Sequence, residues 1–302
     1  MPAWIIWTLL TLISWGVWAI LFRLMGDSLS SAQSQAVSTL GVIPILAALC
    51  LMKDVPHPGN RPRGVLLALG SGILSCLGNV ACYEALNHAK AATVVPLTAL
   101  YPLVTVLLAV PLLKERVNLW QLIGIGASLV AIYLFNVPQS PGVEAGLASR
   151  WLLLPVAAIL FWGITQLMQK VATSEISPRS TAIWFLVAFV PVAGVVLIQD
   201  PLPSDLSPQT WALAAAMGFA LALGNLTILL AFGAGGKASI IGPLTGLYPL
   251  VSLPISIFGF HEQLSQREAF GIGLALIAVV LLAAQSDPDS ASPPIIESTG
   301  AP

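Results

Sequence analysis

The stretch Val95-Pro-Leu-Thr-Ala-Leu-Tyr-Pro-Leu-Val104 returns, nearly unchanged, as Gly242-Pro-Leu-Thr-Gly-Leu-Tyr-Pro-Leu-Val251. Each copy places two prolines inside a long apolar run, although proline breaks a helix interior and removes a hydrogen bond from a sheet. The two copies are 147 residues apart (243 − 96), and the same offset relates the Trp-Gly pairs that begin at Trp15 and Trp162. The sequence therefore predicts an internal duplication in which this stretch holds the same place in each half.

The composition excludes a soluble protein. Of the 302 residues, 57% are hydrophobic and only 8% are charged, with a mean hydropathy of +0.91, whereas soluble chains carry roughly 25% charged residues. Apolar windows of about 20 residues, the length that a helix needs to cross a bilayer, recur along the chain. A net charge of −1 provides no basic excess for phosphates, so no nucleic acid partner is expected. Ten membrane-spanning helices are expected, at residues 4–22, 31–52, 64–86, 91–113, 118–137, 151–172, 180–199, 209–232, 238–259 and 268–285.

The ten expected spans form two groups of five. An odd number of spans per repeat inserts the second copy upside down, and such inverted repeats are typical of secondary transporters. We therefore predict an all-α integral membrane protein with ten transmembrane helices as two inverted five-helix repeats. The alternative is a duplication that only builds a scaffold. The expected parts are a first repeat at 1–137, a linker at 138–150, a second repeat at 151–285 and a disordered cytoplasmic tail at 286–302.

The basic residues predict the orientation, because Lys and Arg concentrate on cytoplasmic loops. With the N-terminus inside, both termini are cytoplasmic, and the inner loops hold eight of the 12 basic residues: Lys53, Arg61, Arg63, Lys114, Arg116, Lys170, Arg179 and Lys237.

The duplicated motifs resemble those of one known family. They are the alanine and Pro-Leu that open spans 4 and 9, the Tyr-Pro-Leu that follows, Lys114-Glu-Arg116, His261-Glu-Gln263, and the Gly-x-Gly pairs of spans 5 and 10. Together they resemble the EamA-type ten-helix members of the drug/metabolite transporter superfamily. The resemblance implies a carrier of the plasma (bacterial inner) membrane, often an exporter of amino acids or other small metabolites. It also implies a central cavity lined by helices 1, 3, 4, 6, 8 and 9.

Nine residues are candidates for substrate binding. Proline in each repeated stretch frees a carbonyl four residues earlier, and such groups persist at membrane depth only where protein or a watery cavity satisfies them. Buried tyrosine hydroxyls and mid-membrane amides need partners, and the tryptophans lie deeper than interfacial ones. Packing and hydrogen bonding between helices remain alternatives for each. The candidates are Trp15, Asn79, Thr98, Tyr101, Trp162, Gln166, Asn225, Thr245 and Tyr248.

Five further residues are candidates for gating or coupling. Pro102 and Pro249 are expected to kink spans 4 and 9, which either shapes the cavity or only fits the helices together. Glu84, the one carboxylate in the interior of an expected span, is expected near the outer face, as a coupling residue or a snorkelling acid. Lys90 and Lys237 open spans 4 and 9, as interfacial anchors or as a pair of anion clamps.

These candidates support three hypotheses. The first is a secondary transporter that exports a small zwitterionic or amphipathic metabolite, such as an amino acid. The second is an organic-anion or sugar-phosphate exchanger, based on Lys90 and Lys237. The third is a membrane-embedded enzyme or scaffold, but the sequence offers no nucleophile, base or metal set, so no catalytic residue, metal or cofactor is expected. The expected partners are a small-molecule substrate and the lipid bilayer, in a monomer or homodimer.

Overall fold

The computed structural model describes residues 3–54, 57–113, 117–135, 150–234, 241 and 244–282, and the regular structure of this part is helical. The helices of the first half are α1 (Ala3–Met25), η1 (Gly26–Ser28), α2 (Ser31–Leu51), α3 (Arg61–His88), α4 (Ala91–Thr98), α5 (Tyr101–Leu113) and α6 (Leu119–Phe135). Those of the second half are α7 (Arg150–Glu175), α8 (Pro178–Val187), α9 (Phe189–Gln199), α10 (Pro208–Gly233), α12 (Pro249–Gly259) and α13 (Gln266–Leu282). The predicted linker and tail lie almost wholly outside the described residues.

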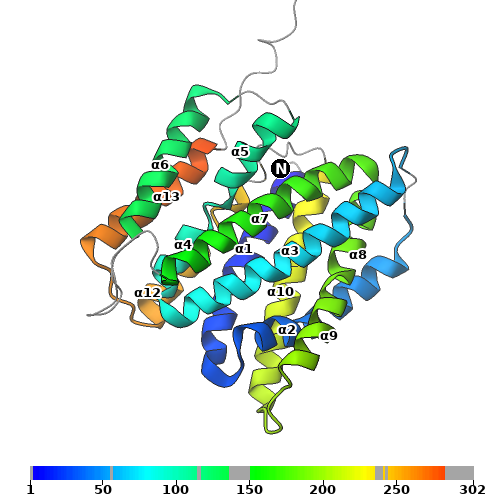
Figure 1. Cartoon of the computed structure of the whole chain (residues 1–302), viewed down its shortest axis with the longest axis horizontal. Coiled ribbons are helices and arrows are strands. Elements are labelled where there is room, and N and C mark those ends of the chain that lie inside the picture. Colours follow the sequence, from blue (N-terminus) through cyan, green and yellow to red (C-terminus); the bar gives the residue numbers. More distant parts are fainter. Residues whose placement is uncertain are drawn as a thin grey trace, which may run out of the picture.

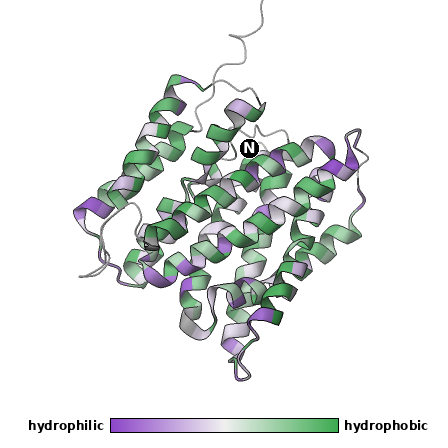
Figure 2. Cartoon of the chain, viewed as in Figure 1, coloured by the Kyte–Doolittle hydropathy of each residue, from purple (hydrophilic) through white to green (hydrophobic). Residues whose placement is uncertain are grey.

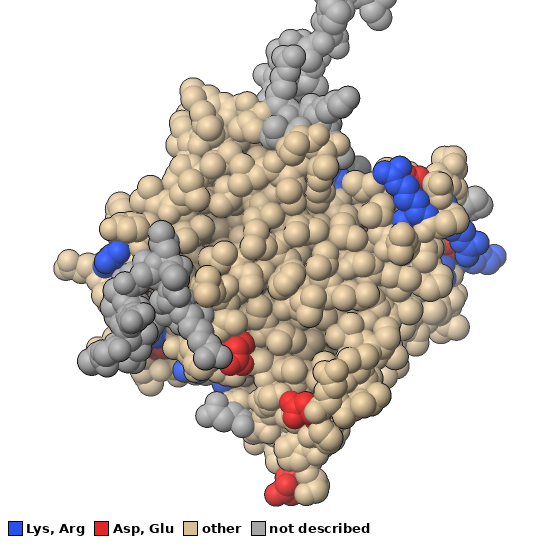
Figure 3. Space-filling view, in the orientation of Figure 1, with Lys and Arg blue, Asp and Glu red and all other residues tan. Residues whose placement is uncertain are grey.

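Within the described residues, seven helical segments are long and apolar enough to cross a membrane, and two further apolar helices are shorter. Large apolar side chains such as Leu66, Ile198 and Phe258 lie exposed on the outside of the bundle. Apolar residues dominate the helices in Figure 2, and the charged side chains in Figure 3 lie near the edges of the face that it shows. This distribution is that of a multi-pass integral membrane protein, and it confirms the predicted all-α class.

The repeated prolines mark helix breaks, where the sequence predicted kinks within the spans at 91–113 and 238–259. α4 ends at Thr98 and α5 begins at Tyr101. Pro102 is therefore the second residue of α5, where a backbone N–H has no partner within the helix. Pro249 is likewise at the start of α12. Proline thus opens a second helix in each copy instead of bending a single one.

A second break was not predicted. The span expected at 180–199 consists of α8 and α9, which meet at Ala188. Pro191 lies in the first turn of α9, so its missing N–H again falls where an intrahelical bond is not required. Its counterpart Pro44 lies inside the continuous helix α2.

Matching contacts at the two ends of the bundle show the inversion of the repeats. At one end, Ser30 Oγ, before α2, donates to Asp200 Oδ2 after α9, over 2.7 Å. At the other end, Ser177 Oγ, before α8, donates to Asp54 Oδ1 after α2, over 2.6 Å. The serines are counterparts at an offset of 147 (177 − 30), and the aspartates at 146 (200 − 54). The start of the second span in each half therefore meets the end of the second span in the other half.

The helices of the two halves also pack in matched pairs. α1 packs against α10 and α3 against α7, while α6 and α13 lie side by side at one edge of the bundle (Figure 1). A Cβ atom at Gly16 would lie 3.0 Å from the carbonyl oxygen of Tyr248, and one at Gly163 would lie 2.9 Å from that of Tyr101. Glycine at these two places lets α1 and α7 approach the broken helices closely, which brings both broken helices to the centre of the bundle.

Candidate functional site

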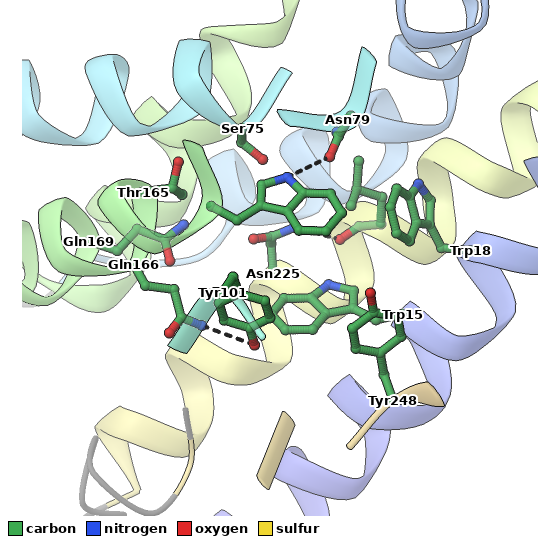
Figure 4. Close-up of a pocket in the computed structure, with 12 residues that line it drawn as sticks. Trp15, Trp18, Ser75, Asn79, Tyr101, Thr165, Gln166, Gln169, Asn225 and Tyr248 are labelled. Carbon is green, nitrogen blue, oxygen red and sulfur yellow. Dashed lines mark hydrogen bonds between the residues drawn. The ribbon is translucent and has the colours of Figure 1, made fainter. Parts of the chain in front are cut away.

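A cavity lies between the two halves, at the breaks of the discontinuous helices (Figure 4). About 50 Å³ of it is open to the centres of water molecules, which is room for a few waters. The side chains that line it come from α1, α3, α7, α10 and the two Tyr-Pro segments. They are Trp15, Trp18, Ser75, Asn79, Tyr101, Trp162, Thr165, Gln166, Gln169, Leu221, Asn225 and Tyr248.

Most of the lining residues are counterparts in the two repeats. The offset of 147 relates the tyrosines (248 − 101) and two positions on α1 and α7, and an offset of 146 relates the asparagines (225 − 79). The five pairs are Trp15 with Trp162, Trp18 with Thr165, Ser75 with Leu221, Asn79 with Asn225, and Tyr101 with Tyr248. The cavity therefore lies on the pseudo-two-fold axis that relates the two inverted repeats, which is where such proteins place a substrate site.

The two tyrosines exchange contacts with the threonines of the opposite copy. The hydroxyl of Tyr248 lies 3.1 Å from Thr98 Oγ1, and that of Tyr101 lies 3.4 Å from Thr245 Oγ1. Tyr101 also accepts a hydrogen bond from Gln166 Nε2 over 3.4 Å. All four tyrosine and threonine side chains are buried. The repeated motif Pro-Leu-Thr-x-Leu-Tyr-Pro thus joins the two broken helices to each other at the cavity.

The Trp-Gly pairs contact a second duplicated pair of residues, Gly78-Asn79 and Gly224-Asn225. A Cβ atom at Gly78 would lie 2.5 Å from Nε1 of Trp162, so the indole occupies space that only glycine leaves. The next residue, Asn79, accepts a hydrogen bond from Trp162 Nε1 over 3.1 Å. Gly224 makes the corresponding close approach to the indole of Trp15. The indoles of both repeats are therefore seated against the glycine of the opposite half.

A chain of buried amides supports one of these indoles from behind. Asn79 Nδ2 donates to Gln35 Oε1 over 2.9 Å, and Gln35 Nε2 lies 3.6 Å from Cys76 Sγ. Gln35 and Asn79 are each 1% exposed. The indole of Trp162 is therefore held through Asn79 by a residue of α2 that does not line the cavity.

Trp18 belongs to a separate aromatic cluster. Its Nε1 donates to the hydroxyl of Tyr83 over 2.7 Å, and the ring of Tyr83 stacks on Phe22 with centroids 4.3 Å apart. The ring of Trp18 also meets Trp162 edge to face at 5.7 Å between centroids. This cluster fixes one wall of the cavity.

Seven of the nine predicted substrate-binding residues line the cavity, and two do not. Thr98 and Thr245 lie behind the tyrosines and contact their hydroxyls. Thr98 Oγ1 also lies 3.0 Å from the carbonyl oxygen of Val94. The hydroxyl thus lies between backbone carbonyls of the preceding turn and the hydroxyl of Tyr248.

The predicted gating and coupling residues are not brought together at the cavity. Glu84 lies one turn from the end of α3, where Ser31 Oγ donates to its Oε2 over 2.7 Å and His88 Nε2 lies 3.1 Å from its Oε1. Pro102 and Pro249 open α5 and α12 beside the lining tyrosines. Lys237 lies outside the described residues.

Lys90 is neutralised away from the cavity. Its Nζ lies 3.1 Å from Glu268 Oε1 and donates to the carbonyl oxygen of Gln263 over 2.8 Å. Glu262 accepts hydrogen bonds from the backbone N–H groups of Ala91 and Ala92, over 3.0 and 2.8 Å. The carboxylate of Glu262 therefore occupies the N-terminus of α4, where the helix dipole favours an anion.

We expect Lys90→Gln and Glu268→Gln each to lower the free energy of unfolding by about 1–2 kcal/mol, because each leaves one partner of a charge-assisted hydrogen bond behind. The Glu268 side chain is 3% exposed and that of Lys90 is 36% exposed, so solvent screening reduces the effect. Unfolding of the purified protein in detergent would measure it, and the double variant should be less destabilised than the sum. Strict additivity would contradict the pairing.

Five lining residues were missed among the predicted binding residues: Trp18, Ser75, Thr165, Gln169 and Leu221. A signal for them exists in the helical spacing. Each lies three or four residues from a predicted residue on the same helix, and such neighbours share a face. The comparison of the repeats did not reveal Ser75 and Thr165, because their counterparts are Leu221 and Trp18.

The lining residues include no charged side chain. Among the described residues, no group of three or more His, Cys, Asp or Glu side chains is placed to hold a metal ion. The chemistry that this cavity offers is therefore hydrogen bonding by amides, hydroxyls and indoles, together with contact against aromatic faces.

The sequence matches the EamA-like transporter family twice, over residues 2–137 and 149–284. Uncharacterized protein MJ1333.1 of Methanocaldococcus jannaschii is 30% identical over 133 residues, which are 44% of this chain and 96% of that protein. That relative is thus about as long as one repeat.

A solved crystal structure of a protein superimposes with a TM-score of 0.60 at 17% identity, covering 91% of this chain and 94% of the other. At that identity the match shows the fold alone. The two family matches account for most of the sequence and confirm the resemblance seen in the duplicated motifs. The chain therefore belongs to the EamA-like transporter family, a family of membrane transporters within the drug/metabolite transporter superfamily.

Proposed function

We propose that the protein is a secondary transporter that exports a small zwitterionic or amphipathic metabolite, such as an amino acid, by alternating access. The observation that carries this proposal is the central cavity. Matched residues of both repeats line it, and none of the lining side chains is charged. Three tryptophans and two tyrosines offer flat apolar faces, while the asparagines and glutamines offer hydrogen bonds. Such a surface suits a molecule that carries little net charge and has both apolar and polar parts.

The broken helices support the alternating-access part of the proposal. Each Tyr-Pro segment contacts the other through a tyrosine and a threonine at the cavity. A break between two short helices is a place where φ and ψ can change with little loss of regular structure, as at a hinge. The open space of about 50 Å³ suits a few waters rather than a metabolite, so binding requires the cavity to widen.

We propose that the carrier lies in the plasma membrane with both termini cytoplasmic, as a monomer or homodimer. Support for the orientation comes from the bundle end that holds Asp54 and Ser177, where Arg63 pairs with Glu175 at 3.1 Å and Arg179 with Asp54 at 3.7 Å. Basic residues gather at cytoplasmic ends.

The organic-anion or sugar-phosphate alternative has less support. An anion clamp needs a cation that faces the ligand, but Lys90 is paired with Glu268. No cationic side chain is among the lining residues.

Counterflow in proteoliposomes tests the proposal. Vesicles are loaded with one unlabelled compound each, from a set of neutral amino acids and a set of sugar phosphates, and labelled uptake is followed without an ion gradient. We expect exchange of neutral amino acids and none of phosphates, with protein-free vesicles as the control. Exchange of phosphates alone would replace the proposed substrate class with the anionic one, and exchange of neither would overturn both.

A further inference from the structure

The two matched tryptophans, Trp15 and Trp162, differ in whether the indole N–H has a hydrogen-bond partner. In one copy, Trp162 Nε1 donates to Asn79 Oδ1 over 3.1 Å, and Asn79 in turn donates to Gln35 over 2.9 Å. This indole has its hydrogen bond within the protein. Its orientation is fixed by buried amides whether or not a ligand is present.

The equivalent chain is missing in the other copy. The counterpart of Gln35 is Ala182 (182 − 35 = 147), whose methyl group cannot receive a hydrogen bond. Asn225 instead donates to the carbonyl oxygen of Leu221 on its own helix, over 2.9 Å. Trp15 Nε1 is buried and has no hydrogen-bond partner among the described residues.

Gln169 supplies a second donor of the same kind. Its side chain is 4% exposed and lines the cavity, and its Nε2 also has no hydrogen-bond partner in the described part of the chain. The counterpart of Gln169 is Phe22 (169 − 147), which stacks on Tyr83. The amide is thus peculiar to the second half. Figure 4 shows Trp15 and Gln169 on α1 and α7, at different sides of the cavity.

Unpartnered buried donors are uncommon, because each costs roughly 1–3 kcal/mol when it has lost water without gaining a partner. Three buried side-chain atoms of the described residues are of this kind, and two of them, Trp15 Nε1 and Gln169 Nε2, belong to residues that line the one cavity described above. Both are donors. A ligand that satisfies them must bring hydrogen-bond acceptors.

We propose that Trp15 and Gln169 are the ligand-binding donors of the cavity, that they receive the acceptor oxygens of a carboxylate-bearing zwitterion, and that Trp162 is a fixed wall. This inference rests on the proposed function, because it identifies the contacts of the same substrate. A carboxylate fits better than a phosphate, because neutral donors suffice for one negative charge and the lining residues provide no cation. The apolar faces of the tryptophans and tyrosines remain for the rest of the molecule.

The test replaces the indole N–H group of each tryptophan in turn. Incorporation of 3-benzothienylalanine at position 15 or 162 exchanges the indole N–H for sulfur and keeps the ring size. The probes are L-leucine, L-methionine and L-phenylalanine, each compared with its amino alcohol, which lacks the carboxylate. The readouts are the half-saturation concentration in counterflow and the unfolding midpoint in detergent.

At position 15 we expect the half-saturation concentration for the amino acids to rise about tenfold, with an unchanged or higher unfolding midpoint, because no hydrogen bond within the protein is lost. At position 162 we expect the opposite pattern, with a lower midpoint and a smaller change in half-saturation, since Asn79 loses its donor. Gln169→Met should resemble the change at position 15. The amino alcohols should compete only weakly with the amino acids for exchange by the unmodified protein. The replacement at position 15 should weaken this competition little further.

Equal effects on half-saturation at positions 15 and 162, or none at 15 and 169, would overturn the inference while the proposed function stands. Competition by the amino alcohols as strong as that by the amino acids would overturn the carboxylate. Absence of amino acid exchange by the unmodified protein would overturn the proposed function, and the identity of this ligand with it.

Discussion

Gly218→Ala is expected to lower the free energy of unfolding by about 3 kcal/mol or more. Among the glycines of the described residues, an added methyl group meets backbone most closely at this one. Gly218 lies on α10 where this helix packs against α2, and an added Cβ would overlap the carbonyl oxygen of Ser38. On the facing helix, a Cβ at Gly41 would overlap the carbonyl oxygen of Ala215. The obstacle is backbone in both directions, so rotation of a side chain cannot relieve it, and the helices must separate.

Thermal unfolding of the purified protein in detergent measures this effect, and the yield of folded protein gives a second readout. Gly126→Ala and Gly273→Ala are matched controls, because each glycine is in a helix and a Cβ there meets no atom within 4 Å. Alanine favours a helix over glycine by about 1 kcal/mol, so the controls should be neutral or more stable. A Gly218→Ala variant that unfolds at the midpoint of the controls would mean that α2 and α10 are not in backbone contact.

The repeat made much of this arrangement predictable from the sequence. Because the second half copies the first, residues that are identical at an offset of 147 or 146 indicated what the duplication had preserved. Trp15 and Trp162, the two asparagines and the two tyrosines all came from that comparison, and all of them line the cavity. Helix number followed from apolar length, which the bilayer thickness dictates.

What was not predicted depends on contacts between distant helices. Pro44 and Pro191 are counterparts, yet one lies inside a continuous helix and the other follows a break, so the residue alone does not decide the outcome. Gln35 does not line the cavity, and its function became visible only through Asn79. Trp15 Nε1 lacks a partner where Ala182 stands in place of Gln35, and Gln169 stands in place of Phe22. A search for identical positions passes over both of these differences.

Replacement of Asn79 by leucine is the second change with a large expected effect. Asn79→Leu removes the acceptor of Trp162 Nε1 and the donor to Gln35 Oε1 together. Two buried groups then lose their partners at roughly 1–3 kcal/mol each, so we expect a loss of about 2–6 kcal/mol in the free energy of unfolding. We also expect amino acid exchange to fall more than tenfold, because the indole of Trp162 loses its orientation.

Asn225→Leu is the natural comparison, since Asn225 holds the same place in the other repeat and differs only in its partners. Its amide donates to the carbonyl oxygen of Leu221 on the same helix, and Trp15 Nε1 has no partner among the described residues to lose. This variant should therefore lose about 1 kcal/mol or less in detergent unfolding. The two variants would then differ by a factor of two or more in the free energy of unfolding that they lose, although the two asparagines are counterparts. The reason is that Asn79 has Gln35 as a partner, whereas the counterpart of Gln35 is Ala182. Equal losses of stability in the two variants would show instead that the amide chain behind Trp162 does not stabilise the fold, and that repeat symmetry alone sets the energetics of the cavity.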